Sequence, residues 1–200
     1  MEKKLNICPY MIDLTPNIIL SKPQLGENIG STARAMKNFG IEKLRLIEPR
    51  DGWPNSSAYA ISAGADDVLN KINVFKSLEE ATKDISLLFA TTARKRVIGT
   101  KPLDVFEAID KSFHHVVNGG QVGFLFGPEQ SGLSNDDVVQ ADYTISIPLN
   151  QNFSSLNLSQ AVLLICWEWN KVKMSHFKED NLPIKVNKKL KKSTEISNVG

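Results

Sequence analysis

The sequence predicts an α/β domain with a mainly parallel sheet and helices on both faces. Short apolar runs alternate with longer segments of helical periodicity, and the alternation continues almost to the lysine-rich end of the 200-residue chain. Hydrophobic residues make up 42% of the chain and charged residues 23%, the balance of an ordinary folded protein. A chain of this size can bury a core without help from disulfides or a metal ion.

Six short apolar runs are the predicted strands. Each spans four or five residues and is followed by a polar loop or a segment with helical periodicity. The runs are residues 17–20, 44–47, 72–75, 87–90, 122–126 and 143–147.

Helix signals fill the gaps between these runs. Asn28 is predicted to cap a first helix, and Gly40 to end it. Ser77 and Glu80 have the spacing of a capping box, and Ser134 is expected to cap a later helix. A long helix is predicted to start near Ser155. Its apolar face consists of Leu158, Ala161, Val162, Ile165, Trp169 and Val172.

Four loops follow predicted strands and are rich in glycine, small hydroxyls and amides: residues 21–30, 91–99, 127–132 and 148–157. Ligands of an open parallel sheet bind at the carboxyl ends of its strands. Each loop alone is an ordinary turn, but their occurrence together at one edge favours a small polar ligand.

Three segments carry the chemical signal. In residues 28–40, Gly30 permits close approach of another backbone and Arg34 can hold a phosphate. In residues 126–133, Glu129 can accept hydrogen bonds from a ribose or an arginine. Residues 147–161 join a strand to the long helix, and they offer more hydroxyl and amide groups than a cap requires. These groups belong to Ser154, Ser155, Asn157 and Ser159.

Together the three segments resemble the motifs of SPOUT RNA methyltransferases of the SpoU or TrmH class, in the same order, over residues 17–173. Residues 28–40, 91–94 and 154–157 look most like the TrmJ-like branch, which 2′-O-methylates the anticodon loop of tRNA. Residues 151–153 depart from the pattern. The resemblance implies S-adenosylmethionine as cofactor, a homodimer and a C-terminal trefoil knot. A bottom-up topology argument would discard such a knot.

The resemblance also assigns site residues. The positions expected to hold S-adenosylmethionine are Thr91, Thr92, Ala93, Gly127, Ile147, Pro148, Ser154, Ser155 and Leu156. The polar positions expected around the reacting ribose are Asn28, Arg34, Glu129, Ser155 and Asn157. No metal is implied.

Positioning should dominate the chemistry, because a sulfonium already makes its methyl group electrophilic. In this family, removal of the 2′-hydroxyl proton is often assigned to the motif arginine, which corresponds to Arg34 in this chain. A guanidinium stays protonated in proteins and is a poor base. We therefore expect Arg34 to clamp a phosphate and stabilise the forming alkoxide, with water or a phosphate oxygen taking the proton.

Other functional classes fit less well. A nicotinamide dehydrogenase would need the G-x-G-x-x-G fingerprint, and a serine hydrolase G-x-S-x-G or an equivalent nucleophile; neither occurs. The histidines, His114, His115 and His176, lie outside the motif loops and form no metal-ligand pattern. Methylation of ribosomal RNA by the same chemistry and a catalytically silent RNA-binding dimer remain as alternatives. The lack of a separate N-terminal RNA-binding domain favours tRNA over ribosomal RNA, and the intact polar positions favour an enzyme.

The predicted organisation is an N-terminal lead over residues 1–16, the methyltransferase domain over 17–173 and a basic tail over 174–200. Residues 171–200 contain eight lysines against three acidic residues, although the whole chain carries only +2. A basic tail on a slightly acidic body suits a polyanionic partner, although a solvated terminus has the same composition.

Cys8 and Cys166 show no paired spacing and are expected to be reduced thiols. No segment has the pattern of a signal peptide or a membrane span. We therefore expect a cytoplasmic protein with no membrane contact.

Overall fold

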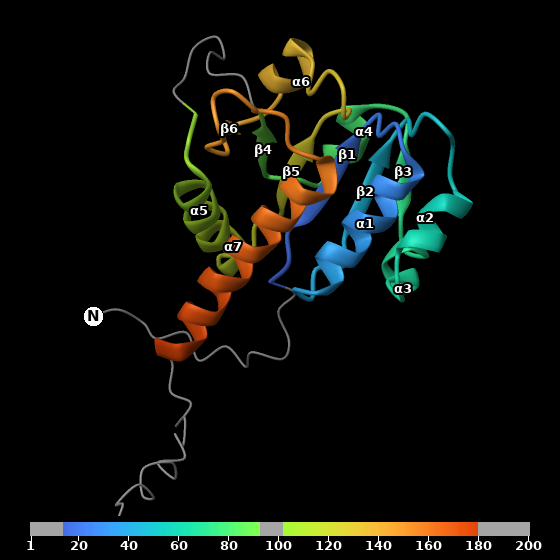
Figure 1. Cartoon of the computed structure of the whole chain (residues 1–200). Coiled ribbons are helices and arrows are strands. Elements are labelled where there is room, and N and C mark those ends of the chain that lie inside the picture. The colour runs from blue at the N-terminus through green and yellow to red at the C-terminus, as the bar shows by residue number, and fades with distance from the viewer. Residues whose placement is uncertain (1–13, 93–101, 180–200) are drawn as a thin grey trace, which may run out of the picture.

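The structure is a computed structural model that describes residues 14–92 and 102–179. Six strands form one sheet in the order β3-β2-β1-β5-β4-β6, and every pair of neighbours is parallel (Figure 1). The strands are β1 (Asn17–Ser21), β2 (Leu44–Ile47), β3 (Asn73–Phe75), β4 (Leu87–Thr91), β5 (Val122–Phe126) and β6 (Tyr143–Ile145). All six predicted strands are confirmed, with ends shifted by at most two residues.

Seven helices connect and follow the strands in this part of the chain. They are α1 (Gly26–Lys37), α2 (Ser56–Ile61), α3 (Asp66–Leu69), α4 (Leu78–Thr82), α5 (Val105–Val117), α6 (Asn135–Val139) and α7 (Leu158–Glu179). One core cluster joins the sheet to α1, α2, α3, α5 and α7, and a second joins its other face to α4 and α6. The prediction of helices on both faces is therefore confirmed. The trefoil knot stays a prediction of the resemblance.

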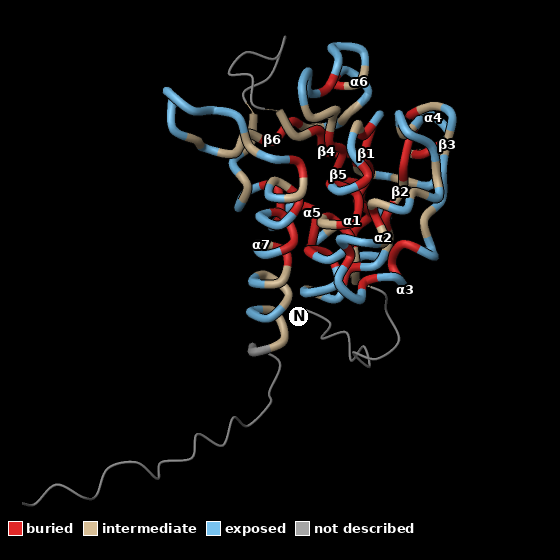
Figure 2. The backbone as a smooth tube through the Cα atoms, turned by 45° about the vertical axis from the view of Figure 1, so that its right-hand side comes forward, coloured by how far each residue is buried: buried red, intermediate tan, exposed pale blue. Residues whose placement is uncertain are grey.

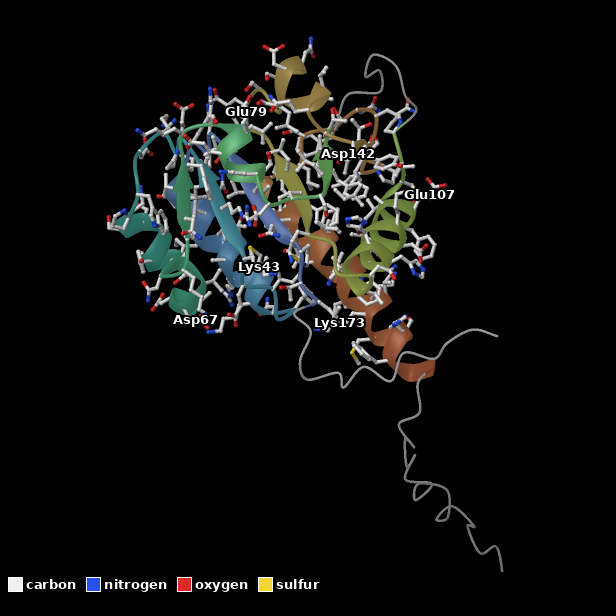
Figure 3. All side chains as sticks on the ribbon, turned by 180° about the vertical axis from the view of Figure 1, so that it is seen from behind. Lys43, Asp67, Glu79, Glu107, Asp142 and Lys173 are labelled. Atoms are coloured by element: carbon white, nitrogen blue, oxygen red, sulfur yellow. The ribbon has the colours of Figure 1, made fainter. Side chains whose placement is uncertain are left out.

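The two central strands are buried along their whole length (Figure 2). Ile18 and Leu20 of β1 face the first cluster, and Ile19 faces the second. Burial on both sides explains why these strands appear in the sequence as continuous apolar runs and not as alternating ones. In Figure 3, Lys43 lies before β2 and Glu79 lies after β3. The two residues therefore lie toward opposite ends of the parallel strands, because all strands run in the same direction.

The prediction that Asn28 caps the first helix is wrong. Helix α1 begins at Gly26, and Asn28 lies inside its first turn, where only 7% of the residue is exposed. Its side chain is bonded to residues far away in the chain, a pairing that local sequence rules do not include. The predicted stop at Gly40 is confirmed, because α1 ends at Lys37 and Gly40 turns the chain with φ of 67°.

The other capping predictions are largely confirmed. Ser77 accepts a hydrogen bond from the Glu80 amide, although Glu80 reaches back to the amide of Lys76 and not to that of Ser77. Ser134 caps α6 in a complete capping box.

The predicted start of the long helix near Ser155 is three residues too early. Asn157 caps α7 by accepting bonds from the amides of Ser159 and Gln160 at 2.9 and 3.4 Å. The preceding residues form a loop that lines a cavity described below, so they are not available to the helix. Helix α7 also continues past Lys173 to Glu179, into the segment assigned to the basic tail.

Helix α7 packs its apolar face into the core as predicted. Val162, Ile165 and Trp169 are fully buried, and the indole N–H of Trp169 donates to the Leu14 carbonyl at 3.1 Å. Cys166 lies on the same buried face, where desolvation raises the pKa of its thiol to about 12. The prediction of a free structural thiol is confirmed for Cys166, whereas Cys8 lies outside the described residues. No helix in residues 14–92 or 102–179 is long and apolar enough to cross a membrane.

Two glycines let α1 pack closely against α2 and its N-cap residue, Asn55. A Cβ at Gly30 would overlap the carbonyl group of Ala58, and one at Gly26 would overlap the side chain of Asn55. The predicted close backbone approach at Gly30 is therefore real, and the approaching backbone belongs to α2. This packing fixes the start of α1 relative to the carboxyl edge of the sheet.

Candidate active site

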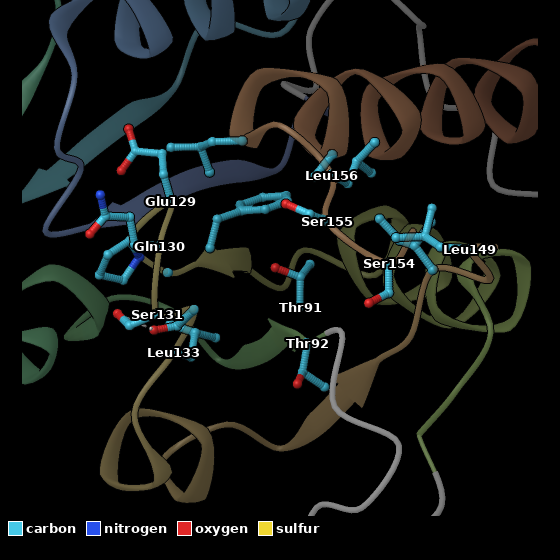
Figure 4. A pocket seen from close by; sticks show the side chains of 17 residues that line it. Thr91, Thr92, Glu129, Gln130, Ser131, Leu133, Leu149, Ser154, Ser155 and Leu156 are labelled. Atoms are coloured by element: carbon cyan, nitrogen blue, oxygen red, sulfur yellow. Dashed lines mark hydrogen bonds between the residues drawn. The ribbon is translucent and has the colours of Figure 1, made fainter. Parts of the chain in front are cut away.

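A cavity of about 330 Å³ opens at the carboxyl ends of β4, β5 and β6 (Figure 4). Its walls come from the residues after β4, the β5–α6 loop, the β6–α7 loop and the first turn of α7. Parallel strand direction brings these loops to one edge, as the sequence predicted. Described residues of three of the four predicted ligand loops therefore line one space, and from the loop 91–99 these are Thr91 and Thr92. The fourth, residues 21–30, contacts the cavity wall through Glu129.

Most positions expected to hold the cofactor line this cavity. They are Thr91, Thr92, Gly127, Ile147, Ser154, Ser155 and Leu156. Pro148 does not line it, and Ala93 lies outside the described residues.

Sequence reasoning missed most of the apolar part of the wall, which includes Phe126, Leu133, Leu149 and Leu158. Leu149 stands directly before the polar run of the β6–α7 loop, and a lone leucine there was the only local signal. The cavity combines these apolar surfaces with loop backbone and hydroxyl groups. Such a composition suits a ligand with one flat apolar part and several polar groups.

The β5–α6 loop is shaped by its glycines. A Cβ at Gly127 would overlap the backbone of Gly132 and Leu133, so the loop can fold back on itself only with glycine at this position. Gly132 has φ of 65°, a conformation that side chains disfavour. Thr91 completes this part of the wall, and its hydroxyl donates to the Leu125 carbonyl at 2.9 Å. The loop therefore presents a fixed backbone surface to the cavity.

A hydrogen-bonded chain joins the three motif segments. The amide of Asn157 donates to the side-chain oxygen of Asn28 at 2.9 Å. The amide of Asn28 in turn donates to Glu129 at 2.8 Å. Glu129 also accepts the backbone N–H groups of Gln24 at 2.8 Å and Leu25 at 3.2 Å. The structure thus brings together three predicted site residues. Asn28 lies 101 positions from Glu129 and 129 positions from Asn157 in the chain.

This chain leaves Asn28 little capacity for a substrate. Both polar groups of its side chain are engaged, and the residue is buried. Asn157 is likewise bonded to Asn28 and to the start of α7. A carboxylate can only accept, so Glu129 sets the direction of every bond in the chain. The geometry thus gives these residues a positioning task.

Arg34 is not brought to the cavity by its own chain. It lies on the exposed side of α1, two turns from the helix start, and is absent from the cavity wall. Ser155, the remaining predicted ribose contact, does line the cavity. The predicted constellation is therefore incomplete within a single chain.

A basic residue that the sequence did not single out lies near Glu129. A hydrogen bond from Arg50 to Asp51 raises the pKa of the guanidinium, and the charge of Glu129 adds to the effect. The Arg50 amide also donates to the Pro23 carbonyl at 3.0 Å, which ties the β2–α2 connection to the loop after β1. Within residues 14–92 and 102–179, no three histidine, cysteine or acidic side chains gather as a metal site.

Comparison with known proteins agrees with this architecture. Residues 15–167 match the model of the SpoU rRNA methylase family. A curated relative from Pseudomonas aeruginosa, tRNA (cytidine/uridine/adenosine-2′-O-)-methyltransferase TrmJ, is 34% identical over 89% of this chain and 67% of its own length. The crystal structure of TrmJ from Z. mobilis ZM4 is 50% identical, with a TM-score of 0.75 over 78% of this chain and 69% of that chain.

A more distant structure shares the fold. It is the SpoU methyltransferase AviRb from Streptomyces viridochromogenes in complex with AdoMet, 23% identical, with a TM-score of 0.65 over 80% of this chain and 61% of that one. The chain spans between 58 and 67% of the lengths of the first curated relatives it matches. The family model, in contrast, matches well over half of the chain and includes all three motif segments. The chain therefore belongs to the SpoU rRNA methylase family.

Proposed function

We propose that this chain is an S-adenosylmethionine-dependent RNA 2′-O-methyltransferase that acts on a cytidine or uridine of the tRNA anticodon loop. The cavity carries the proposal, because the end of β4 and the β5–α6 and β6–α7 loops line it with positions that the family resemblance assigns to the cofactor. The name of the P. aeruginosa relative supports tRNA as the substrate. This activity would place the protein in the cytoplasm.

The cavity has the chemistry that the cofactor requires. Leu149, Leu156 and Ile147 offer apolar surface for an adenine ring, and the backbone of the β5–α6 loop offers hydrogen-bonding groups. When bound, S-adenosylmethionine supplies an electrophilic methyl group. The protein's task is then to hold the ribose in line with that group and exclude water.

Arg34 is proposed to clamp the substrate phosphate and stabilise the alkoxide that forms at the 2′ oxygen. Because it lies outside its own cavity, it would serve the cavity of a second copy. An exposed apolar face on α7 supports this homodimer, since large contiguous apolar patches mark interfaces. The face consists of Leu163, Leu164, Trp167 and Met174, each 38 to 50% exposed.

The function is tested first with the cofactor and RNA. Calorimetry should show binding of S-adenosylmethionine or its demethylated product, with no comparable binding of NAD. Ribose-methylation mapping should then show a new 2′-O-methyl group in the anticodon loop of unmodified tRNA. A product in ribosomal RNA alone would replace the tRNA assignment. Binding of RNA without any methyl transfer would favour the silent RNA-binding dimer.

The role of Arg34 is tested by substitution. Arg34→Ala and Arg34→Lys should both abolish methyl transfer and leave cofactor affinity unchanged, because a point charge does not reproduce the guanidinium fork. Lys37→Ala is the matched control, since it removes a basic side chain one turn away on the same helix. Full activity of the lysine variant would refute the clamp.

The use of Arg34 across the dimer is tested by complementation. Leu156→Glu should block the cavity in one chain, and Arg34→Ala should remove the clamp in the other. Each variant alone should be inactive. Co-expressed, they form a mixed dimer in which one of the two composite sites is intact, so activity should return. If activity stays absent in a mixed dimer proved by mass, Arg34 does not serve the partner's cavity.

A further inference from the structure

Phe153 is an exposed aromatic side chain beside the cavity that the proposed function has not used. It lies in the β6–α7 loop, and 74% of the residue is accessible to solvent. The next residue, Ser154, lines the cavity, whereas Phe153 does not. A phenylalanine with this exposure places a large apolar ring in water next to the candidate active site.

The loop holds this ring outward by a closed turn. The side-chain oxygen of Asn150 accepts a hydrogen bond from the backbone N–H of Asn152 at 2.9 Å. The backbone N–H of Phe153 donates to the backbone carbonyl of Asn150 at 3.0 Å. Asn150, Gln151, Asn152 and Phe153 are all exposed, and Figure 2 shows this connection as a projecting segment between β6 and α7. The turn therefore presents one aromatic ring together with three amide side chains.

The composition of the loop selects the kind of partner. Residues 148–157 contain no charged side chain, so they are poorly suited to grip phosphates. Aromatic rings stack on unpaired bases, and amide groups can bond the edges of those bases. A nucleotide whose ribose reaches Ser155, the predicted ribose contact in the cavity wall, brings the bases of its neighbours to the surface next to Phe153.

We propose that Phe153 is a stacking platform for an unpaired base adjacent to the methylated nucleotide. The proposal rests on the proposed RNA methyltransferase function and adds a specificity residue to it. Stacking of one base on an aromatic ring contributes about 1–3 kcal/mol, which corresponds to about 5- to 150-fold in RNA affinity.

The test compares RNA binding by variants of the full chain. Phe153→Ala should weaken tRNA binding about 5- to 150-fold, and Phe153→Tyr or Phe153→Trp should keep it within about threefold of the parent protein. Cofactor affinity and the mass in light scattering should not change. Phe106→Ala is the matched control, because Phe106 is also an exposed phenylalanine, 62% accessible, but lies on α5 outside the cavity wall.

A base-deleted substrate identifies the contact. The tRNA is prepared with an abasic residue on either side of the methylated nucleotide, and one of these positions should abolish the difference between the parent protein and Phe153→Ala. Equal RNA affinity of both proteins for intact tRNA would overturn the proposal. A loss of RNA affinity accompanied by a fall in mass would also overturn it, because Phe153 would then contact a second copy. Failure of the parent protein itself to bind or methylate RNA would instead overturn the proposed function.

Discussion

The hydrogen bonds that Glu129 accepts from Asn28, Gln24 and Leu25 should stabilise the fold, because a donor faces an acceptor in each of them. In Glu129→Gln, one carboxylate oxygen becomes an NH₂ group. When that group faces Gln24, the hydrogen bond from the Gln24 N–H to a charged acceptor is lost. The hydrogen bonds from Leu25 and Asn28 remain, but their acceptor is then a neutral amide oxygen. A hydrogen bond to a charged group contributes about 1.5–3 kcal/mol, so we expect a loss of about 2–3 kcal/mol. For a protein of this size, that loss corresponds to about 4–12 °C in Tm.

Asn28→Asp should cost at least as much, because it replaces the donor to Glu129 by a second carboxylate. The double variant Asn28→Asp, Glu129→Gln restores a complementary pair, with the new glutamine amide donating to the new aspartate. That aspartate would still accept the bond from Asn157. The double variant should therefore be more stable than the sum of the two single changes predicts, by about 1–2 kcal/mol.

The assay is urea unfolding followed by tryptophan fluorescence at one fixed protein concentration, because the stability of the proposed homodimer would depend on concentration. Glu27→Gln is the matched control, since it removes an exposed carboxylate from the first turn of α1, next to Asn28. Its loss should stay within about 1 kcal/mol. The positioning role is refuted if Glu129→Gln unfolds like the control, or if the double variant equals the sum of the single variants.

Three further outcomes are expected. Gly30→Ala should lower stability by about 1–3 kcal/mol, because its Cβ overlaps Ala58; an unchanged urea midpoint would contradict this packing. Cys166 should resist iodoacetamide at pH 8.5 in the folded protein and react after unfolding, as peptide mass mapping can show. Burial raises the pKa of the folded Cys166 thiol to about 12, above that of an unfolded thiol. The stability of the fold is therefore at its full value below about pH 8.5 and decreases as pH rises toward 12, because the unfolded thiol ionises first. Modification of the native thiol at pH 8.5 would contradict the expected protection. Deleting residues 183–200 should weaken tRNA binding and reduce its log–log salt slope by about 0.7–0.9 per lost phosphate contact. Identical slopes would mean that this segment does not touch RNA.

Local patterns determined the secondary structure well. The continuous apolar runs predicted all six strands to within two residues, because buried parallel strands need apolar side chains on both faces. Ser134 and Gly40 were recognisable as helix boundaries, since caps and left-handed turns depend on neighbouring residues. The motif segments also indicated which loops surround a common cavity, because all parallel strands end at one edge.

Only the tertiary structure decided what the site residues contact. Asn28 resembled a helix cap from its neighbours, yet its partners Glu129 and Asn157 lie 101 and 129 positions away. Strand order places β1 beside β5 and thereby sets Glu129 next to the start of α1, a neighbourhood that no local periodicity specifies. Arg34 stands outside the cavity for a related reason: helical geometry carries it two turns away from the carboxyl edge of the sheet. Motif order identified the residues, but long-range packing determined which of them meet.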